Sequence, residues 1–220
     1  MQREIKLTAD GSHTIAIPET NVTYHSHHGA IAESRWVFLD AGFSYLHGTS
    51  QHDTINVLEI GFGTGLNALL TLQEAIVQQQ KVHYTAVEKY PLTQEEFEKI
   101  NHGRLLHAEE NFLALHKAEW EKDIAIGPFF TLHKKNISLD DLLPGTKANC
   151  IYFDAFAPTD QPELWTQEVF EKLFSMLLPG GVLVTYSSKT TVRRAMQAAG
   201  FTVTKIPGPR GKRDMVRALK

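Results

Sequence analysis

A glycine-rich stretch flanked by acidic residues is the part of the sequence with the clearest chemical character. Within residues 56–67, Glu59 stands two positions before the first of three alternating glycines, and Glu88 ends the next apolar run. Glycines are needed where a backbone bends sharply and approaches a ligand closely, and an acid at the second position can accept hydrogen bonds from ribose hydroxyls. The pattern predicts an adenosine-binding site that consists of Glu59, Gly61, Gly63, Gly65, Asn67 and Glu88. The alternative is a tight strand-helix turn beside a solvated glutamate.

The spacing within this stretch separates two classes of adenosine cofactor. Dinucleotide sites use GxGxxG with a helix N-terminus facing a pyrophosphate, whereas the pattern here is ExGxGxG. The spacing and the position of Glu59 resemble motif I of the class I methyltransferases, in which that acid helps to hold the cationic methionine end of S-adenosylmethionine. A carboxylate suits this cation and would repel a pyrophosphate. We therefore expect S-adenosylmethionine as the cofactor.

Asp154 is the candidate catalytic residue because it directly follows a short apolar run at residues 149–153. In an open α/β sheet, residues just beyond the carboxyl ends of central strands line the ligand crevice. Position alone leaves a helix N-cap or a turn aspartate equally open. Phe156 and Trp165 stand nearby and offer flat walls for a base, although either side chain could equally belong to the core.

Alternating apolar segments indicate which elements position these residues. Short runs rich in β-branched or aromatic residues predict strands at residues 55–60, 82–87, 129–132, 149–153, 181–186, 201–206 and 215–219. Stretches with helical spacing lie between them, at residues 66–79, 93–115, 165–178 and 190–199. This alternation predicts a mostly parallel, doubly wound sheet with helices on both faces, as in the Rossmann-like class I methyltransferase fold. The last two strands are too close for a crossover helix, so we expect an antiparallel hairpin at one edge.

Length and composition limit the class of protein. With 220 residues, 42% of them hydrophobic, the chain can bury one sizeable core. We expect a single domain over residues 1–220 with an N-terminal embellishment at about residues 1–50. No apolar stretch has the length of a bilayer span or the character of a signal peptide, which predicts a cytoplasmic protein with no membrane partner. Cys150 is the only cysteine, so an internal disulfide and a CxxC zinc site are excluded.

The cluster of His25, His27 and His28 is the remaining candidate for a metal site. No cysteine and no second group of ligands accompanies it, so we expect no metal and interpret the segment as a loop that lines the pocket. Glu33 and Arg35 follow this loop. Their spacing assigns them no role beyond an ion pair on a helix surface.

The charge distribution is uneven although the net charge is only -3. Residues 189–220 contain nine Lys or Arg and one acid, whereas the preceding residues contain thirteen Lys or Arg and twenty-four acids. A basic segment on an acidic body predicts contact with a polyanion, and a solvated charged face is the alternative. The candidates for this contact are Lys189, Arg193, Arg194, Lys212 and Arg213.

Several motifs in the same order resemble the methyltransferase domain of the MnmC family, whose stand-alone form is called MnmD. They lie at residues 24–26, 29–30, 33–39, 59–67, 88–92, 154–158, 164–166 and 211–215, so the resemblance covers nearly the whole chain and includes Tyr24 as a candidate substrate contact. It implies methylation of the amine of 5-aminomethyl-(2-thio)uridine at the wobble position of tRNA. Bifunctional members carry an oxidase domain after this one, so the resemblance implies the methyl-transfer step alone. A separate oxidase or upstream tRNA-modification enzymes would then be further partners.

One position departs from the family pattern. After the third strand the family usually has Gly-Asp, and here Lys135 and Asn136 occupy that place. Asn136 is therefore the candidate for the adenine contact, because its amide can still accept a hydrogen bond.

The chemistry of the amine suggests the role of Asp154. A primary alkylamine with a pKa of about 10.4 is protonated at neutral pH and then has no lone pair for attack on a sulfonium methyl. We expect Asp154 to accept a hydrogen bond from the amine and to aim its lone pair, with the proton leaving to solvent or to Asp154.

Three other functions remain open from the sequence. One is a polyamine-synthase-like aminopropyl transferase, which would not need the basic segment. Another is a nicotinamide dehydrogenase, which the ExGxGxG spacing and the final hairpin disfavour. The last is a non-catalytic RNA-binding module, against which the presence of Glu59, Glu88 and Asp154 argues.

Overall fold

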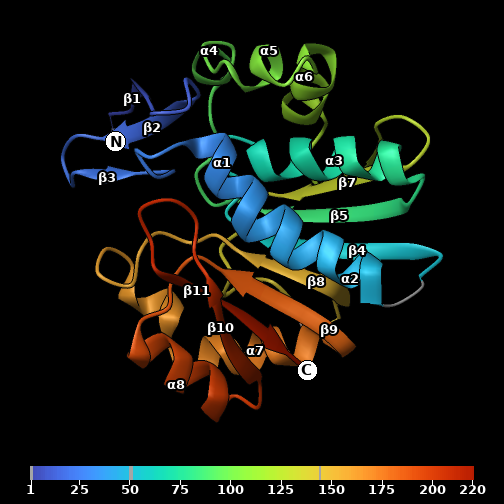
Figure 1. Ribbon diagram of the computed structural model, residues 1–220. Coiled ribbons are helices and arrows are strands. Elements are labelled where there is room, and N and C mark those ends of the chain that lie inside the picture. Colours follow the sequence, from blue (N-terminus) through green and yellow to red (C-terminus); the bar gives the residue numbers. More distant parts are fainter. Residues whose placement is uncertain (1, 50–51, 144) are drawn as a thin grey trace.

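The main sheet of the computed structural model has eight strands in the order β10-β11-β9-β8-β4-β5-β7-β6 (Figure 1). The structure describes residues 2–49, 52–143 and 145–220. Five neighbouring strands run parallel, and these are β9 (Leu177–Thr185), β8 (Ala148–Phe153), β4 (Thr54–Ile60), β5 (Lys81–Val87) and β7 (Phe130–Lys135). The chain runs outward from β4 to β7 and then returns to β8 on the other side of β4. This reversal places a ligand crevice at the carboxyl ends of β4 and β8.

Antiparallel strands close both edges of this sheet. β11 (Asp214–Leu219) pairs with β9 on one side and with β10 (Thr202–Pro207) on the other, and this confirms the predicted terminal hairpin. At the opposite edge, the short β6 (Asp123–Ala125) pairs with β7. The sequence did not indicate β6, because three residues are too few to show an alternating pattern.

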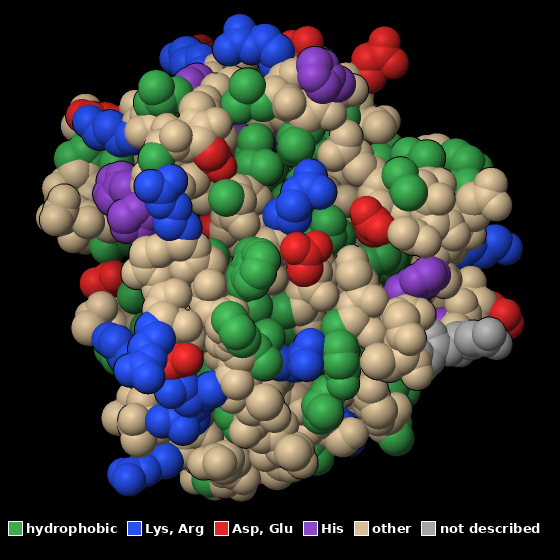
Figure 2. All heavy atoms as spheres, in the orientation of Figure 1, with side chains coloured by type: hydrophobic (Ala, Val, Ile, Leu, Met, Phe, Trp, Pro, Cys, Tyr) green, Lys and Arg blue, Asp and Glu red, His purple; other side chains and the backbone are tan. Residues whose placement is uncertain are grey.

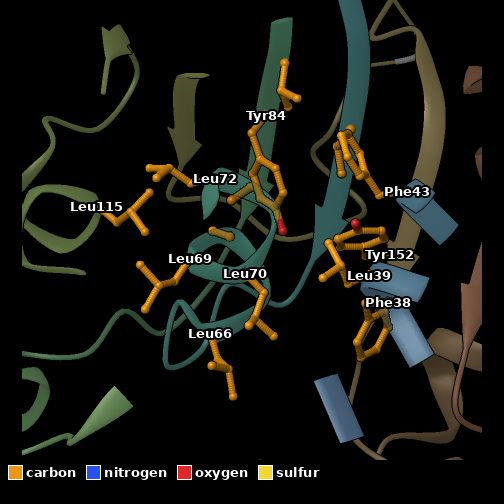
Figure 3. Close-up of a cluster of buried hydrophobic side chains, with 14 of the residues drawn as sticks. Phe38, Leu39, Phe43, Leu66, Leu69, Leu70, Leu72, Tyr84, Leu115 and Tyr152 are labelled. Atoms are coloured by element: carbon orange, nitrogen blue, oxygen red, sulfur yellow. The ribbon is translucent and has the colours of Figure 1, made fainter. Parts of the chain in front are cut away.

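Helices cover both faces of the sheet, as the alternating pattern predicted. One face carries α3 (Leu66–Gln78), α6 (Glu109–Lys117) and η1 (Arg35–Ser44), while α7 (Gln167–Met176) and α8 (Thr190–Ala198) cover the other. Figure 3 shows the first of these layers, in which Phe38 and Phe43 of η1 lie beside Tyr152 of the sheet. Within the part of the chain that the structure describes, no helix has the length and apolarity needed to span a membrane.

The N-terminal region contains regular structure that the sequence did not reveal. β1 (Glu4–Leu7), β2 (His13–Ile17) and β3 (Val22–Thr23) form a separate three-stranded sheet. A continuous helical run then follows, made of α1 (Ala30–Ser34), η1 and α2 (Tyr45–Thr49). Gly42 of η1 allows close packing, since a Cβ there would lie 3.0 Å from side-chain atoms of Tyr152 and Val184. This helical run is therefore packed against the central strands β8 and β9.

The predicted helix over residues 93–115 is wrong in its continuity. Three short helices occupy this stretch, α4 (Gln94–Phe97), α5 (His102–Leu105) and α6. The side chain of Asn101 interrupts the run, because it accepts a hydrogen bond from the His13 amide at 2.8 Å and donates one to the Gly11 carbonyl at 2.9 Å. A second break lies at His107, whose φ is 52°. Tertiary contacts with the N-terminal sheet therefore override the helical spacing.

The boundaries around the predicted helix at residues 165–178 also differ. A 3₁₀ turn, η2 (Pro162–Trp165), comes first, and Thr166 then caps α7 by accepting a hydrogen bond from the Val169 amide. β9 begins at Leu177, four residues before the predicted start at residue 181. Gly180 and Gly181 lie inside this strand, and glycine within a strand is a poor boundary signal.

Candidate active site

A cavity of about 910 Å³ opens at the carboxyl ends of β4, β5 and β8. Its walls come from the glycine-rich turn after β4, the end of β5, the loop after β8 and the N-terminal segment around residues 20–28. Sites for small ligands usually occupy about 300–1,000 Å³. The cavity is therefore large enough for a cofactor together with a second group.

The glycine-rich turn forms the floor between β5 and β8. The amide of Gly61 donates to the Val87 carbonyl at 2.9 Å, and a Cβ at Gly61 would lie only 2.7 Å from the Asp154 carbonyl oxygen. Gly61 also has a φ of 95°, which only glycine adopts readily. Gly65 is the N-cap of α3 with a φ of 69°. These positions require glycine because other chain segments approach the backbone from both sides.

Glu88 lies at the end of β5 and lines the cavity. Its two carboxylate oxygens accept hydrogen bonds from the amides of Gly63 at 3.0 Å and Tyr90 at 2.7 Å. A carboxylate offers about four acceptor positions, so two remain for a pair of hydroxyl groups. The backbone fixes the carboxylate, and this arrangement fits a ribose.

Asn136 lies behind Glu88, outside the residues that line the cavity. Its amide nitrogen donates to the Glu88 carbonyl at 2.8 Å and to the Lys89 carbonyl at 3.3 Å, so it braces the loop after β5. The cavity wall on this side is formed by residues 137–140. The sequence expectation of an adenine contact at Asn136 therefore does not match the position of its side chain.

Asn67 connects two of the predicted acidic residues. Its amide nitrogen donates to Glu59 Oε1 and to Asp154 Oδ2, both at 2.9 Å, and its own side-chain oxygen is buried without a partner. Glu59 is completely buried, lies beneath the cavity lining, and has a pKa well above its usual value because of that burial. Asn67 lines the cavity, whereas Glu59 lies beneath it, and one oxygen of each side chain is buried without a hydrogen-bond partner. Asn67 therefore links the buried Glu59 to Asp154 in the cavity wall.

Asp154 lies in the cavity wall, directly after β8. Burial raises the pKa of its carboxyl to about 7, and the nearby Glu33 carboxylate adds to this effect. The hydrogen bond from Asn67 and the charge of Lys212 act in the opposite direction. A carboxyl group that titrates near neutral pH is a better proton acceptor than an ordinary aspartate.

An aromatic pair stands on the same side of the cavity as Asp154. The rings of Tyr24 and Phe156 meet edge to face with centroids 5.3 Å apart, and both residues line the cavity. Trp165 does not line it. Its indole nitrogen donates to the Phe156 carbonyl at 2.8 Å, and its ring packs on Phe153 in the core. Of the two predicted flat walls, Phe156 is at the surface of the cavity and Trp165 supports it from behind.

Neutral histidines surround Thr64 at the other end of the turn. His25 Nε2 lies 2.8 Å from the Thr64 hydroxyl, and His116 Nε2 donates to the Thr64 carbonyl at 3.0 Å. Burial lowers the pKa of both imidazoles to about 4. Among the described residues, no group of three or more His, Cys, Asp or Glu is arranged to hold a metal ion. His25 therefore helps to fix the turn and the N-terminal loop.

Basic residues surround a smaller hollow of about 310 Å³ beside the main cavity. Lys189, Lys212 and Arg213 line it, and the hollow shares Ala157, Tyr186 and Lys212 with the cavity. Arg193 and Arg194 lie on α8, which begins at this hollow. Figure 2 shows Lys and Arg side chains gathered at the lower left, over the region where Figure 1 draws α8. The turn between β10 and β11 thus contributes Lys212 to both the cavity and the hollow.

Glu33 is a cavity residue to which the sequence assigned no role. Only 9% of its side chain is exposed, and Oε1 accepts from Lys212 Nζ at 2.7 Å. The alternative of a surface pair with Arg35 is not observed, since Arg35 is exposed on the next helical segment. Glu33 had no signal in the sequence beyond its presence in a motif shared with the family, and Lys212 was predicted as a polyanion contact, whereas the structure pairs Lys212 with Glu33. A charged pair so distant in sequence has no spacing pattern.

Comparison with proteins of known sequence identifies several relatives. Residues 78–220 match a family described as S-adenosyl-L-methionine-dependent methyltransferase. A protein of Cupriavidus metallidurans, named tRNA 5-methylaminomethyl-2-thiouridine biosynthesis bifunctional protein MnmC, is 32% identical over 216 residues that cover 91% of this chain. The chain spans 32% of the length of that relative.

Two solved structures share the fold over nearly the whole chain. MNMC2 from Aquifex aeolicus is 26% identical with a TM-score of 0.76, over 99% of this chain and 70% of that chain. Spermidine synthase from Thermotoga maritima is 15% identical with a TM-score of 0.61, over 98% of this chain and 67% of that chain, and this similarity concerns the fold alone. The family match covers residues 78–220, and the sheet order and the glycine-rich turn with Glu88 are those expected for such a methyltransferase. The chain belongs to the S-adenosyl-L-methionine-dependent methyltransferase family.

Proposed function

We propose that this protein transfers the methyl group of S-adenosylmethionine to the primary amine of 5-aminomethyl-(2-thio)uridine at the wobble position of tRNA. The observation that carries this proposal is the position of Asp154 in the cavity wall, held by Asn67 and next to the aromatic pair of Tyr24 and Phe156. The name of the Cupriavidus relative, which refers to biosynthesis of a methylaminomethyl uridine in tRNA, supports the choice of substrate.

The cofactor end of the cavity binds the adenosine and methionine parts of S-adenosylmethionine. Glu88 accepts hydrogen bonds from the ribose hydroxyls, and Asn67, which lines the cavity beside Asp154, contacts the methionine part. Glu59 holds Asn67 in place from below. Family membership favours this cofactor over the decarboxylated form used by an aminopropyl transferase and over a nicotinamide dinucleotide.

Bound S-adenosylmethionine supplies an electrophilic methyl group on a cationic sulfur. Asp154 accepts a hydrogen bond from the amine and aims the nitrogen lone pair at this methyl group. As the new N–C bond forms, the S–C bond breaks and its electron pair stays on sulfur, which becomes neutral. The amine loses one proton, which Asp154 accepts because its pKa lies near 7, or which leaves to solvent.

The environment of the amine determines whether it arrives with a lone pair. A lone carboxylate favours the ammonium form, whereas exclusion of water and the positive sulfur favour the neutral amine. Tyr24 and Phe156 contribute to this exclusion because their rings cover the cavity beside Asp154. They also offer flat surfaces against which an unstacked uridine can lie.

The basic surface delivers the RNA to the cavity. Lys189 and Arg213 line the hollow next to the cavity, and Arg193 and Arg194 extend this surface along α8. Phosphate contacts here would hold the anticodon backbone while the wobble base enters the cavity. The uneven charge of the sequence thus follows from the nature of the substrate.

Calorimetric titration and nucleoside analysis test the proposal. We expect S-adenosylmethionine to bind, and its decarboxylated form and NAD to bind much more weakly. Incubation with tRNA that carries the aminomethyl precursor should yield the methylaminomethyl nucleoside, measured by mass spectrometry. Asp154→Asn removes the carboxylate with little change in volume, and as the matched control it should bind S-adenosylmethionine but yield much less of the methylated nucleoside. Cofactor binding without any methylated nucleoside in the tRNA would refute the proposed substrate.

A further inference from the structure

A partly buried ion pair, between the buried Glu33 and the half-buried Lys212, crosses the end of the cavity near Asp154. Glu33 on α1 accepts from Lys212 Nζ through one carboxylate oxygen, and from the amide of Ser26 at 2.7 Å through the other. Lys212 lies in the turn between β10 and β11, so the pair joins segments 179 positions apart. Both residues line the cavity. The bridge therefore connects the N-terminal loop to the C-terminal hairpin.

The bridge continues to the loop that carries Asp154. Lys212 Nζ lies 4.0 Å from the centroid of the Tyr186 ring, and the Tyr186 hydroxyl donates to the Ala155 carbonyl at 2.8 Å. Ala155 is the residue after Asp154. A continuous set of contacts thus links Ser26, Glu33, Lys212 and Tyr186 to the backbone beside the candidate catalytic carboxyl.

We infer that Glu33 and Lys212 are positioning residues, which hold the substrate end of the cavity around Asp154 and set the charge that an incoming amine meets there. The two charges of the pair have opposite effects on the pKa of Asp154, and replacing one partner alone reveals the effect of the other. The inference rests on the proposed function for the identity of the amine, but the effect on Asp154 itself does not.

Other groups that face Asp154 carry little charge that could mask this effect. Glu59 reaches it from β4 through Asn67, and burial favours the protonated form of Glu59. The phenol of Tyr186 at the end of β9 stays neutral because burial raises its pKa. Glu33 and Lys212 are the two charged residues that act directly on the pKa of Asp154, while Glu88 and Asp160 line the same cavity and stay unchanged in the variants below.

Single-charge variants of the bridge should move the pH dependence of methyl transfer in opposite directions. Glu33→Gln removes a negative charge near Asp154 and the amine, so both groups lose protons more easily. We expect the half-maximal pH of single-turnover transfer to fall by about half a unit or more. Lys212→Met should raise it by a similar amount, and the double variant should return close to the parent. Lys212→Arg, which keeps the charge, should retain the midpoint of the parent.

A direct titration of the Asp154 carboxyl separates this inference from the proposed function. The ¹³C carboxyl signal of Asp154, assigned by its loss in Asp154→Asn, should shift its midpoint downward in Glu33→Gln and upward in Lys212→Met without any tRNA. Should Lys212→Met fail to fold, Lys212→Gln removes the same charge. Glu4→Gln and Lys6→Met, which alter an exposed pair on β1 at 2.8 Å, are the controls and should shift nothing.

The outcomes are distinguishable. Midpoints that stay unchanged, or that move in the same direction in both single variants, would show that the bridge acts only as structure and overturn the inference. A parent that fails to methylate tRNA would overturn the proposed function, while the carboxyl titration would still decide the inference.

Discussion

The two ends of the cavity are built in different ways. The cofactor end comes from β4, the turn after it, α3 and the end of β5, which are close in sequence, and its key contacts are hydrogen bonds to backbone amides. The substrate end combines the N-terminal loop, α1, the loop after β8 and the β10–β11 turn, which are joined by side chains. The cofactor end is therefore local and rigid, while the substrate end depends on how distant segments meet.

This difference has a functional consequence. A cofactor site made of backbone groups tolerates changes in neighbouring side chains, since the glycine turn and β5 fix its geometry. A substrate site made of charged and aromatic side chains can adapt to a different acceptor with few substitutions. Variants at each end should therefore separate binding of S-adenosylmethionine from transfer of its methyl group.

The largest expected effect is on chemistry at the substrate end. Asp154→Ala should lower single-turnover methyl transfer about 10²-fold or more, the usual scale for a positioned acid or base, because the amine loses its hydrogen-bond partner. Affinity for S-adenosylmethionine in calorimetry should stay near that of the parent. Asp53→Ala, which changes an exposed aspartate outside the cavity lining, is the control. Transfer at the parent rate would make Asp154 a turn residue only.

The next effect concerns the cofactor end. Glu88→Ala should weaken binding of S-adenosylmethionine by about 1.5–3 kcal/mol, roughly 10- to 150-fold, because charge-assisted hydrogen bonds to the ribose are lost. Glu88→Gln retains an acceptor for one backbone amide and should lose less. Calorimetry measures both affinities. An affinity equal to that of the parent in the alanine variant would remove Glu88 from the ribose site.

The raised pKa of Asp154 predicts a pH-dependent cost to stability. The carboxyl binds its proton more tightly in the folded than in the unfolded state. Its contribution to the free energy of unfolding therefore falls as pH rises from about 4 to about 7 and is constant above that. Asp154→Asn should therefore gain stability over the parent as pH rises across this range, by on the order of 3–4 kcal/mol at pH 8, since each pKa unit corresponds to about 1.4 kcal/mol. Urea unfolding of both proteins at pH 5, 6, 7 and 8 measures the difference. A difference independent of pH would contradict the raised pKa.

The smallest effects should come from the basic surface. Replacing Arg193 and Arg194 together by alanine, or Lys189 and Arg213 together, should weaken the dependence of tRNA affinity on salt. The slope of log K against log salt concentration should become shallower by about one or less per residue, because fewer counterions are released. Affinity for S-adenosylmethionine should not follow. Lys99→Ala with Lys117→Ala, on exposed positions away from α8, is the matched control. Equal slopes in all the proteins would make this surface a solvated face.

The sequence alone predicted those features that depend on residues close together in the chain. The order of strands and helices, the terminal hairpin and the glycine turn with Glu88 could be predicted, because period, turn chemistry and short spacings are local properties of a chain. The N-terminal sheet and the long helical run were missed. The helical run packs on β8 and β9, and the N-terminal sheet is held through Asn101, so both depend on contacts with distant segments rather than on a clear local pattern.

Only the tertiary structure determined which side chains meet. It placed Asn67 between Glu59 and Asp154, put Trp165 behind Phe156, and paired Glu33 with Lys212 across most of the chain. It also interrupted a predicted helix by giving Asn101 partners in the N-terminal sheet. Residue type and spacing specify what a side chain can do, but its partners, burial and pKa depend on segments that folding brings together.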